Sequence, residues 1–270
     1  MPLTRAPPTD RAGYGSAVPA KQQLRRALAT VGLEARAVAV RRAFEPASRT
    51  QDRRDHEALA TIFAAALSET SNAIDVGAHG GDVLADLLRV APRGDHIAFE
   101  PLPHLARQLQ ERLPRVDVRA VALSDANGTA DFAHVVDRPG WSGLKARPTP
   151  DGAAARVTTI SVPTRRLDDA LPPGYVPALI KIDVEGAELQ VLEGARRTLA
   201  AHRPTLVLEH GLGSADHYGT RPEQLHDLLV AGLGYRIFDL QGQGPYDRAT
   251  FMSTFHTSAR VNFLARPKVV

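Results

Sequence analysis

The stretch Ile74-Asp-Val-Gly-Ala-His-Gly-Gly81 decides the fold of this chain. Its first residues continue a short apolar run that is typical of a buried strand, and residues 82–90 follow with apolar side chains at helical spacing. Gly77 allows a tight turn, while Gly80 and Gly81 let a ligand approach the backbone where a Cβ would intrude. The stretch therefore predicts a strand, a glycine turn and a helix at one side of a ligand site.

The same alternation of short apolar runs and helical patterns continues to the end of the chain. We predict strands at 72–77, 96–100, 116–123, 178–183, 205–209, 235–240 and 260–265, and helices at 82–90, 104–113, 187–200 and 222–231. Strands that alternate with helices in this way pair in parallel through right-handed crossovers. The expected fold is therefore α/β, with a Rossmann-like, mostly parallel, doubly wound sheet.

Two segments depart from this alternation. Hairpin-like runs at 129–136 and 156–163 follow the third strand. The last two strands are joined by a long segment without a helical pattern, so we expect an antiparallel terminal strand.

The chain divides into three predicted parts. Residues 1–20 are rich in Pro, Gly and small polar residues, which indicates a flexible tail. Residues 21–70 form a helical extension with two apolar stripes, at 24–31 and 59–67, and a loop at 41–50 between them. Residues 71–270 form the sheet domain.

Composition excludes several classes of protein. The 270 residues include no cysteine, so disulfides, thiolate metal sites and cysteine nucleophiles are excluded. The 33 Lys and Arg residues exceed the 30 Asp and Glu residues only slightly, are scattered, and are not interleaved with aromatic residues, so we expect no nucleic-acid partner. Without a signal-peptide pattern or a run of 18 apolar residues, we expect no membrane span and a cytoplasmic location.

A carboxylate follows the glycine turn at the spacing of a nucleotide site. Glu100 ends the second predicted strand, where it can accept hydrogen bonds from both hydroxyls of an adenosine ribose. A dinucleotide would favour a different glycine spacing and would place its pyrophosphate poorly beside Asp75. S-adenosylmethionine carries a sulfonium and an amino group, so acidic residues suit it better. A nicotinamide dinucleotide and a purely structural turn remain the alternatives.

The fourth strand ends in a second acidic motif, Ile180-Lys-Ile-Asp-Val-Glu-Gly-Ala-Glu188. Glu185 and Glu188 fall in the first turn of the next predicted helix, where the helix dipole alone favours them. Asp183, at the strand end, is expected to point into the cleft. The third strand ends in Ala122, Leu123 and Ser124, which are candidates to line an adenine ring.

Several of these motifs together resemble the FkbM family of methyltransferases over residues 70–240. They are the two stretches above, Phe99-Glu-Pro101, Arg166-Leu-Asp-Asp169, Val191-Leu-Glu-Gly194 and Pro204-Thr-Leu-Val-Leu-Glu209. The resemblance implies a class I methyltransferase fold and methyl transfer from S-adenosylmethionine to a hydroxyl group of a sugar, glycan or secondary metabolite. Two departures are His79, where the family often has Asn, and Trp141-Ser-Gly143, where it commonly has paired serines.

The resemblance implies cofactor contacts at four positions, and the motif residues around them extend the set. The predicted cofactor-binding residues are Asp75, Gly77, Ala78, His79, Gly81, Glu100, Pro101, Leu123, Ser124, Ser142 and Asp183. A non-catalytic module that only binds the cofactor is an alternative to the enzyme.

Methyl transfer to an alcohol requires a group that takes the hydroxyl proton. Asp183, Glu209 and His210 follow strand ends and are the predicted catalytic residues. The same three could hold a divalent cation such as Mg²⁺, although a metal is not favoured. A zinc set of His79, His210 and His217 fits no known ligand spacing.

The acceptor is expected to be a small molecule or glycan. We expect its contacts in the segments at 137–156, 211–221 and 241–259. The motif Asp183-Val-Glu-Gly lacks the Pro-Pro pattern of methyltransferases that act on nucleic-acid bases, which argues against such an acceptor. The oligomeric state is open, with a homodimer as one option.

Overall fold

The structure, a computed structural model, describes residues 47–146 and 155–268. Arg54–Val270 forms one compact unit, built on a seven-stranded sheet with the order β3-β2-β1-β7-β8-β10-β9. Its strands are β1 (Asn72–Val76), β2 (Ile97–Phe99), β3 (Asp117–Arg119), β7 (Pro177–Ile182), β8 (Thr205–Glu209), β9 (Tyr235–Asp239) and β10 (Asn262–Pro267).

The pairing of the strands confirms the predicted sheet. β1 pairs in parallel with β2 and with β7, so that Val76 lies opposite Phe99 and Ile182. β10 runs antiparallel to both β8 and β9. The chain leaves β1 toward β2 and β3 and then returns to β7 on the other side of β1, so the strand order reverses between β1 and β7. Ligands of such sheets bind beyond the carboxyl ends of the strands at this reversal.

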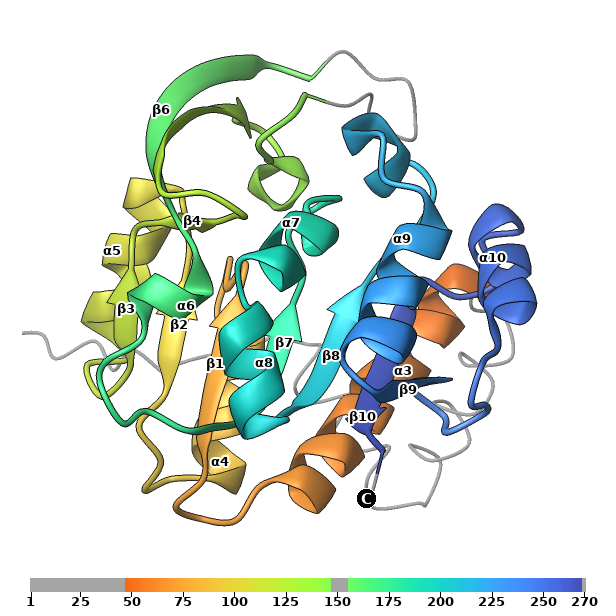
Figure 1. Ribbon diagram of the computed structural model, residues 1–270. Helices are drawn as coiled ribbons and strands as arrows, with labels where there is room; N and C mark the ends of the chain where they lie inside the picture. Colours follow the sequence, from red (N-terminus) through yellow and green to blue (C-terminus); the bar gives the residue numbers. More distant parts are fainter. Residues whose placement is uncertain (1–46, 147–154, 269–270) are drawn as a thin grey trace, which may run out of the picture. The chain divides into compact units, whose positions relative to one another are not determined.

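Helices cover both faces of the sheet (Figure 1). One apolar core joins Ile74, Val76 and their neighbours to α7 (Glu188–Glu193), α8 (Arg196–His202), α9 (Pro222–Asp227) and α10 (Arg248–His256). The other core joins Ala73 and Ala98 to α4 (Asp82–Val90), α5 (Pro103–Arg112) and the later residues of α3 (Ala47–Ala66). Successive residues of one strand point to opposite faces, so the strands are apolar on both.

A small second sheet follows β3. It has the order β4-β6-β5 and consists of β4 (Ala122–Leu123), β5 (Gly128–Val135) and β6 (Val157–Arg165). β5 and β6 form the expected antiparallel pair, and the 3-10 helix η1 (Pro139–Trp141) lies between them in the chain. Figure 1 shows β6 curving across the carboxyl ends of β1 and β2. The short helix α6 (Leu167–Ala170) then leads toward β7.

Two predicted elements are broken in the structure. The strand expected at 116–123 divides into β3 and β4, which belong to different sheets. The helix expected at 187–200 is interrupted between α7 and α8, at Gly194, where a Cβ would lie 2.0 Å from the carbonyl oxygen of Ser124. Close approach between two backbones thus overrides the helical periodicity of the sequence.

Two further expectations about loops were wrong. The segment 241–259 contains α10, whose first turn is capped by the Asp247 side chain as it accepts a hydrogen bond from the Thr250 N–H (2.8 Å). Its Phe251 and Phe255, one helical turn apart, are buried. α3 begins at Ala47, inside the loop expected at 41–50. The helix expected at 222–231 continues past α9 as a π-helical turn, η3 (Leu228–Gly232).

The predicted N-terminal parts lie largely outside the described residues. The tail at 1–20 and the apolar stripe at 24–31 belong to this part of the chain. The second stripe falls in and just after α3, where Ile62, Phe63 and Leu67 are buried. The division at residues 20 and 70 stays a prediction. Among the described helices, none combines the length and the hydropathy that a membrane crossing requires.

Candidate functional site

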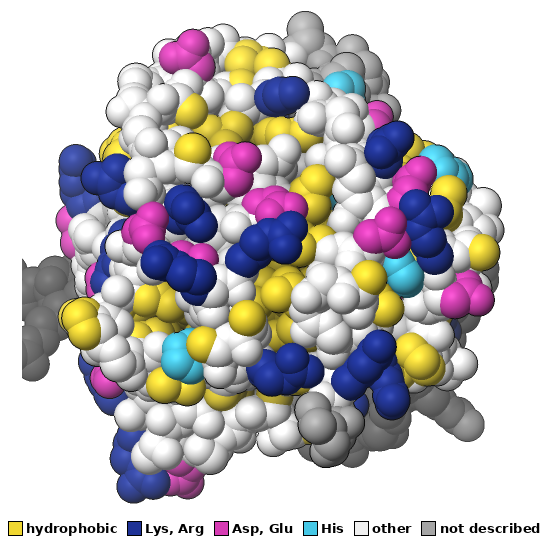
Figure 2. Space-filling view, viewed as in Figure 1, with side chains coloured by type: hydrophobic (Ala, Val, Ile, Leu, Met, Phe, Trp, Pro, Cys, Tyr) yellow, Lys and Arg dark blue, Asp and Glu magenta, His cyan; other side chains and the backbone are white. Residues whose placement is uncertain are grey.

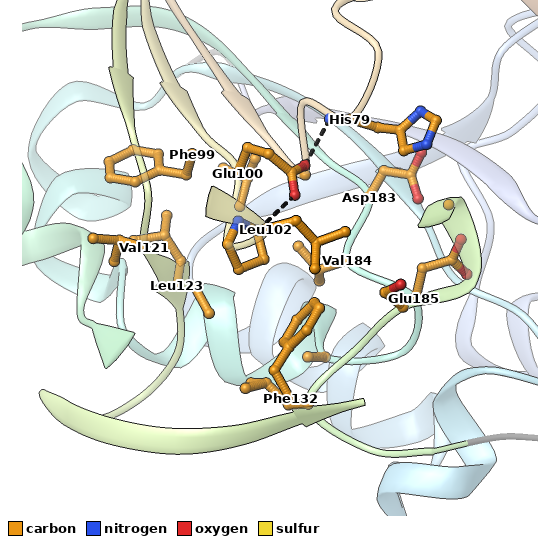
Figure 3. A pocket seen from close by; sticks show the side chains of 18 of the residues that line it. His79, Phe99, Glu100, Leu102, Val121, Leu123, Phe132, Asp183, Val184 and Glu185 are labelled. Atoms are coloured by element: carbon orange, nitrogen blue, oxygen red, sulfur yellow. Dashed lines mark hydrogen bonds between the residues drawn. The ribbon is translucent and has the colours of Figure 1, made fainter. Parts of the chain in front are cut away.

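A cavity of about 230 Å³ opens at the carboxyl ends of β1, β2 and β7 and is capped by the second sheet (Figure 3). Its lining includes seven predicted cofactor-binding residues: Gly77, His79, Glu100, Pro101, Leu123, Ser142 and Asp183. The position agrees with the reversal of strand order beside β1.

Glu100 is a polar group of the cavity that two backbone N–H groups hold. Its side chain is only 4% exposed. Oε2 accepts a hydrogen bond from the His79 N–H (2.8 Å), and Oε1 accepts one from the Leu102 N–H (2.9 Å). Burial raises the pKa of this carboxyl, and the two N–H donors act in the opposite direction. Each carboxylate oxygen keeps a second lone pair, so the fixed group can still accept bonds from a ligand.

The glycine turn owes its shape to protein packing. Gly77 adopts φ +83°, and a Cβ there would lie 1.8 Å from the carbonyl oxygen of Asp183. Gly81, at φ +77°, faces Leu109 and Arg112 of α5 rather than the cavity. His79 also has a positive φ, of 41°, and presents its N–H to Glu100. Gly77 and Gly81 therefore allow other parts of the chain to approach the turn closely. At Gly81 the neighbouring group is α5, and not the ligand expected there from the sequence.

Apolar side chains from separate elements form much of the cavity lining. Figure 3 shows Leu102 beside Glu100, and Phe132, contributed by β5, on the opposite side of the view. The apolar lining residues are Val76, Phe99, Pro101, Leu102, Val121, Ala122, Leu123, Phe132, Pro139, Leu144, Val184 and Ala187. Ser142 adds a hydroxyl, but its Oγ accepts a hydrogen bond from the Val135 N–H (3.0 Å) and so also holds the cap together.

Asp183 is held by a buried lysine. Lys181 lies on β7 with 13% of its side chain exposed, and its Nζ donates to Asp183 Oδ2 (3.1 Å). The same Nζ lies 3.7 Å from Asp75 Oδ1. Asp75 is fully buried, and burial raises its pKa against the lowering effect of Lys181. Asp183 therefore reaches the cavity, whereas Asp75 lies behind it with the lysine.

Glu209, at the end of β8, belongs to the same acidic group but not to the cavity lining. Burial and the neighbouring carboxylates Asp183, Glu185 and Glu188 raise its pKa to about 8, although Lys181 opposes them. A carboxyl with this pKa holds its proton at neutral pH.

His210 lies apart from the cavity. Its side chain is fully buried, stacks on Phe251 and Phe255 of α10, and places Nδ1 3.4 Å from Glu188 Oε2. The described residues contain no group of three His, Asp or Glu side chains arranged to hold a metal ion. The three predicted catalytic residues are therefore not brought together around one point, and only Asp183 reaches the cavity.

Three other predicted cofactor-binding residues stay outside the lining. Ala78 is buried in the core on the α4 side, and Gly81 faces α5. Ser124 turns its hydroxyl toward Asp125, and its carbonyl oxygen contacts Gly194. Asp75, described above, is the fourth.

Sequence reasoning missed two kinds of lining residue. Phe132 and Leu144 come from the hairpin segment, and their place over the cavity depends on how the second sheet folds back. Leu144 falls in the segment 137–156, which was expected to contact the acceptor, whereas Phe132 was not predicted. Glu185 was explained by the helix dipole, yet it lines the cavity with a left-handed backbone (φ 58°). A non-glycine residue in this conformation is often found at functional sites, but the sequence carries no sign of it except the following Gly186.

The charge of the cavity is one-sided. Glu100, Asp183 and Glu185 line it, whereas its described lining includes no Lys or Arg. The arrangement suits a ligand that carries positive charge and disfavours a phosphate or pyrophosphate. On the molecular face in Figure 2, Lys and Arg side chains are interspersed with Asp and Glu rather than gathered in one patch.

Comparison with known proteins shows the family of the chain. The family model described as "Methyltransferase FkbM domain" matches residues 75–237, which is more than half of the chain. The chain belongs to the FkbM methyltransferase family, and the resemblance noted in the sequence is confirmed.

The proteins similar to the chain include two curated relatives and a solved structure. "2-O-methyltransferase NoeI" of Sinorhizobium fredii is 33% identical over 48% of this chain, and "Methyltransferase sdnD" of Sordaria araneosa is 29% identical over 45%. The chain spans 59% of the length of each. The crystal structure of a methyltransferase FkbM from Methylobacillus flagellatus KT aligns at 20% identity with a TM-score of 0.44, covering 74% of this chain and 44% of that one.

Proposed function

We propose that this protein is an S-adenosylmethionine-dependent O-methyltransferase that acts on a hydroxyl group of a small molecule. The observation that carries the proposal is the cavity at the ends of β1, β2 and β7, with three carboxylates and no Lys or Arg in its described lining. A sulfonium and an ammonium group match this charge. The pyrophosphate of a nicotinamide dinucleotide would meet like charge there, which makes the oxidoreductase the weaker alternative.

The residues present fit the cofactor. Glu100 offers two oriented oxygens to the ribose hydroxyls, because its position is fixed by the N–H groups of His79 and Leu102. The apolar part of the lining, with Phe99 and Leu123, suits an adenine ring. Asp183 and Glu185, in the loop after β7, would face the positively charged methionine portion. The other predicted contacts at Asp75, Ala78, Gly81 and Ser124 would act through the surrounding structure.

When bound, S-adenosylmethionine supplies an electrophilic methyl group on sulfur. The chain must then align the acceptor oxygen and accept its proton as the new bond forms. Of the three predicted catalytic residues we assign the proton-accepting role to Asp183, because it alone reaches the cavity and Lys181 orients its carboxylate. Glu209 holds a proton at neutral pH, so it adds no further negative charge beside Asp183. His210 does not line the cavity.

Support for oxygen as the acceptor atom comes from the relative whose name states 2-O-methyl transfer. The acceptor itself we place among sugars, glycans and secondary metabolites, as the family resemblance implies. The cap around η1, the loop with η2 (Ala215–Tyr218) and the segment 241–259 are the proposed acceptor contacts. Homodimer formation and a cytoplasmic location remain proposals.

Calorimetry on the purified protein tests the cofactor assignment. We expect S-adenosylmethionine and S-adenosylhomocysteine to bind and NAD not to bind. A folded protein that bound neither of the first two would overturn the proposal. Incubation with a methyl-labelled donor and panels of hydroxylated acceptors then separates an enzyme from a module that only binds the cofactor, because only the enzyme transfers label.

A further inference from the structure

Residues 183–186, in the loop that joins β7 to α7, have a strained backbone. Glu185 has φ 58° and Gly186 has φ 111°. A left-handed conformation is costly for a residue with a side chain, and it persists only where neighbouring structure holds it. Asp183, Val184 and Glu185 all line the cavity, so the shape of this loop determines one side of the site.

Glu188 holds the loop from within the core. Its side chain is 1% exposed, and Oε1 accepts a hydrogen bond from the Gly186 N–H (2.9 Å). On the other side, Gly186 packs against the segment before η2, where a Cβ would lie 2.5 Å from the carbonyl oxygen of Ser214. The loop is thus fixed between a buried carboxylate and a neighbouring backbone.

The second oxygen of Glu188 faces His210. Nδ1 of His210 lies 3.4 Å from Oε2 of Glu188, and neither side chain is more than 1% exposed. The imidazole is itself fixed, because its ring lies 5.0 Å from that of Phe255 and its backbone N–H donates to the Val261 carbonyl (2.7 Å). A buried carboxylate needs such partners, since an uncompensated one is very unfavourable.

We infer that His210 is a positioning residue, which holds Glu188 so that Glu188 holds the 183–186 loop in the conformation that lines the cavity. His210 acts through Glu188 and does not touch the reacting groups. The consequence for ligand binding rests on the proposed function, because it concerns the same cavity. The state of the loop itself does not depend on any ligand.

Amide hydrogen exchange of the unliganded protein tests the inference directly. In the natural protein the Gly186 amide should be protected. His210→Phe keeps an aromatic ring against Phe255 but cannot pair with Glu188, so exchange at Gly186 should become about tenfold faster while the amide of Leu208 in β8 is unchanged. Glu188→Leu should give the same pattern. Glu188→Gln, which keeps an oxygen for Gly186, should restore most of the protection.

His226→Phe is the matched control. His226 is also buried and also contacts Phe251, at 5.8 Å between ring centroids, but it lies on α9 away from the loop. In this variant the exchange rate of the Gly186 amide should change no more than the rates of the other amides. In calorimetry, His210→Phe should weaken binding of S-adenosylmethionine about tenfold, and His226→Phe should not.

Three results would overturn the inference: an unprotected Gly186 amide in the natural protein, equal exchange in the His210→Phe and His226→Phe proteins, or no rescue by Glu188→Gln. The first result is measured on the natural protein, so it can be obtained even if a variant fails to fold. If the natural protein bound no S-adenosylmethionine, the proposed function would fail, and the exchange data would still decide the role of His210.

Discussion

Glu100 combines two properties at the scale of one residue: it is buried, and its carboxylate is fixed by two backbone donors. Fixing the group before a ligand arrives lowers the ordering cost of binding. An exposed glutamate such as Glu111 is not buried in this way.

We expect Glu100→Ala to weaken binding of S-adenosylmethionine by about 1–3 kcal/mol, the usual value of hydrogen bonds to a charged group. Calorimetry measures the change directly. Glu111→Ala, on the exposed side of α5, is the control and should bind as the natural protein does. Equal affinity in the two variants would show that the ribose does not lie at Glu100.

Asp183→Asn should lower kcat by about 10²- to 10⁴-fold, because the amide keeps the contact with Lys181 but cannot take a proton from the acceptor. The affinity for S-adenosylmethionine should change much less. Single-turnover assays with an identified acceptor separate the two effects. A variant with the natural kcat would remove Asp183 from the proposed mechanism.

At the scale of elements, the decisive contact joins the turn after β1 to the loop after β7. Gly77 lies against the carbonyl oxygen of Asp183, so the two segments that form the floor of the cavity touch through their backbones. Gly80, three residues later, has no atom near the position of a Cβ. Packing therefore requires a glycine at position 77 but not at position 80.

Gly77→Ala should destabilise the fold by about 2 kcal/mol or more, since the methyl group would clash with backbone and the φ of +83° is unfavourable for alanine. Gly80→Ala should change stability by no more than about 0.5 kcal/mol. Urea unfolding followed by circular dichroism compares them. Similar losses in both variants would contradict the close packing of the two loops.

At the scale of the whole molecule, buried carboxyls make the stability depend on pH. Burial raises the pKa values of Asp75, Glu100 and Glu209, the last to about 8 from an ordinary value of 4.5. Between these two values the folded state keeps a proton on Glu209 that the unfolded chain releases. Stability is therefore highest on the acid side of this window and falls as pH rises through it.

Glu209→Gln removes this titration and leaves a neutral side chain of the same size. We expect the free energy of unfolding of the variant to fall less steeply between pH 5 and pH 8 than that of the natural protein, by up to about 1 kcal/mol per pH unit. Chemical denaturation across this range measures both slopes. Identical slopes would mean that Glu209 titrates alike in the folded and unfolded chain.

Much of the sheet could be read from local pattern. The runs that became β1, β7 and β8 are short and apolar because both of their faces are covered, and the glycine turn and Glu100 follow strand ends directly. The break between α7 and α8 at Gly194 could not be predicted from local pattern. The atom that requires a glycine there belongs to Ser124, 70 positions earlier.

The sequence by itself determined the order along the chain of the strands in the seven-stranded sheet, the family, and the cavity-lining residues that adjoin strand ends, Gly77, Glu100 and Asp183. These depend on residues close together in the chain. Only the tertiary structure decided that Phe132 and Leu144 cap the cavity and that His210 lies behind Glu188 rather than in the cavity. Each of these depends on contacts between segments distant in sequence, and such contacts leave no local period or motif.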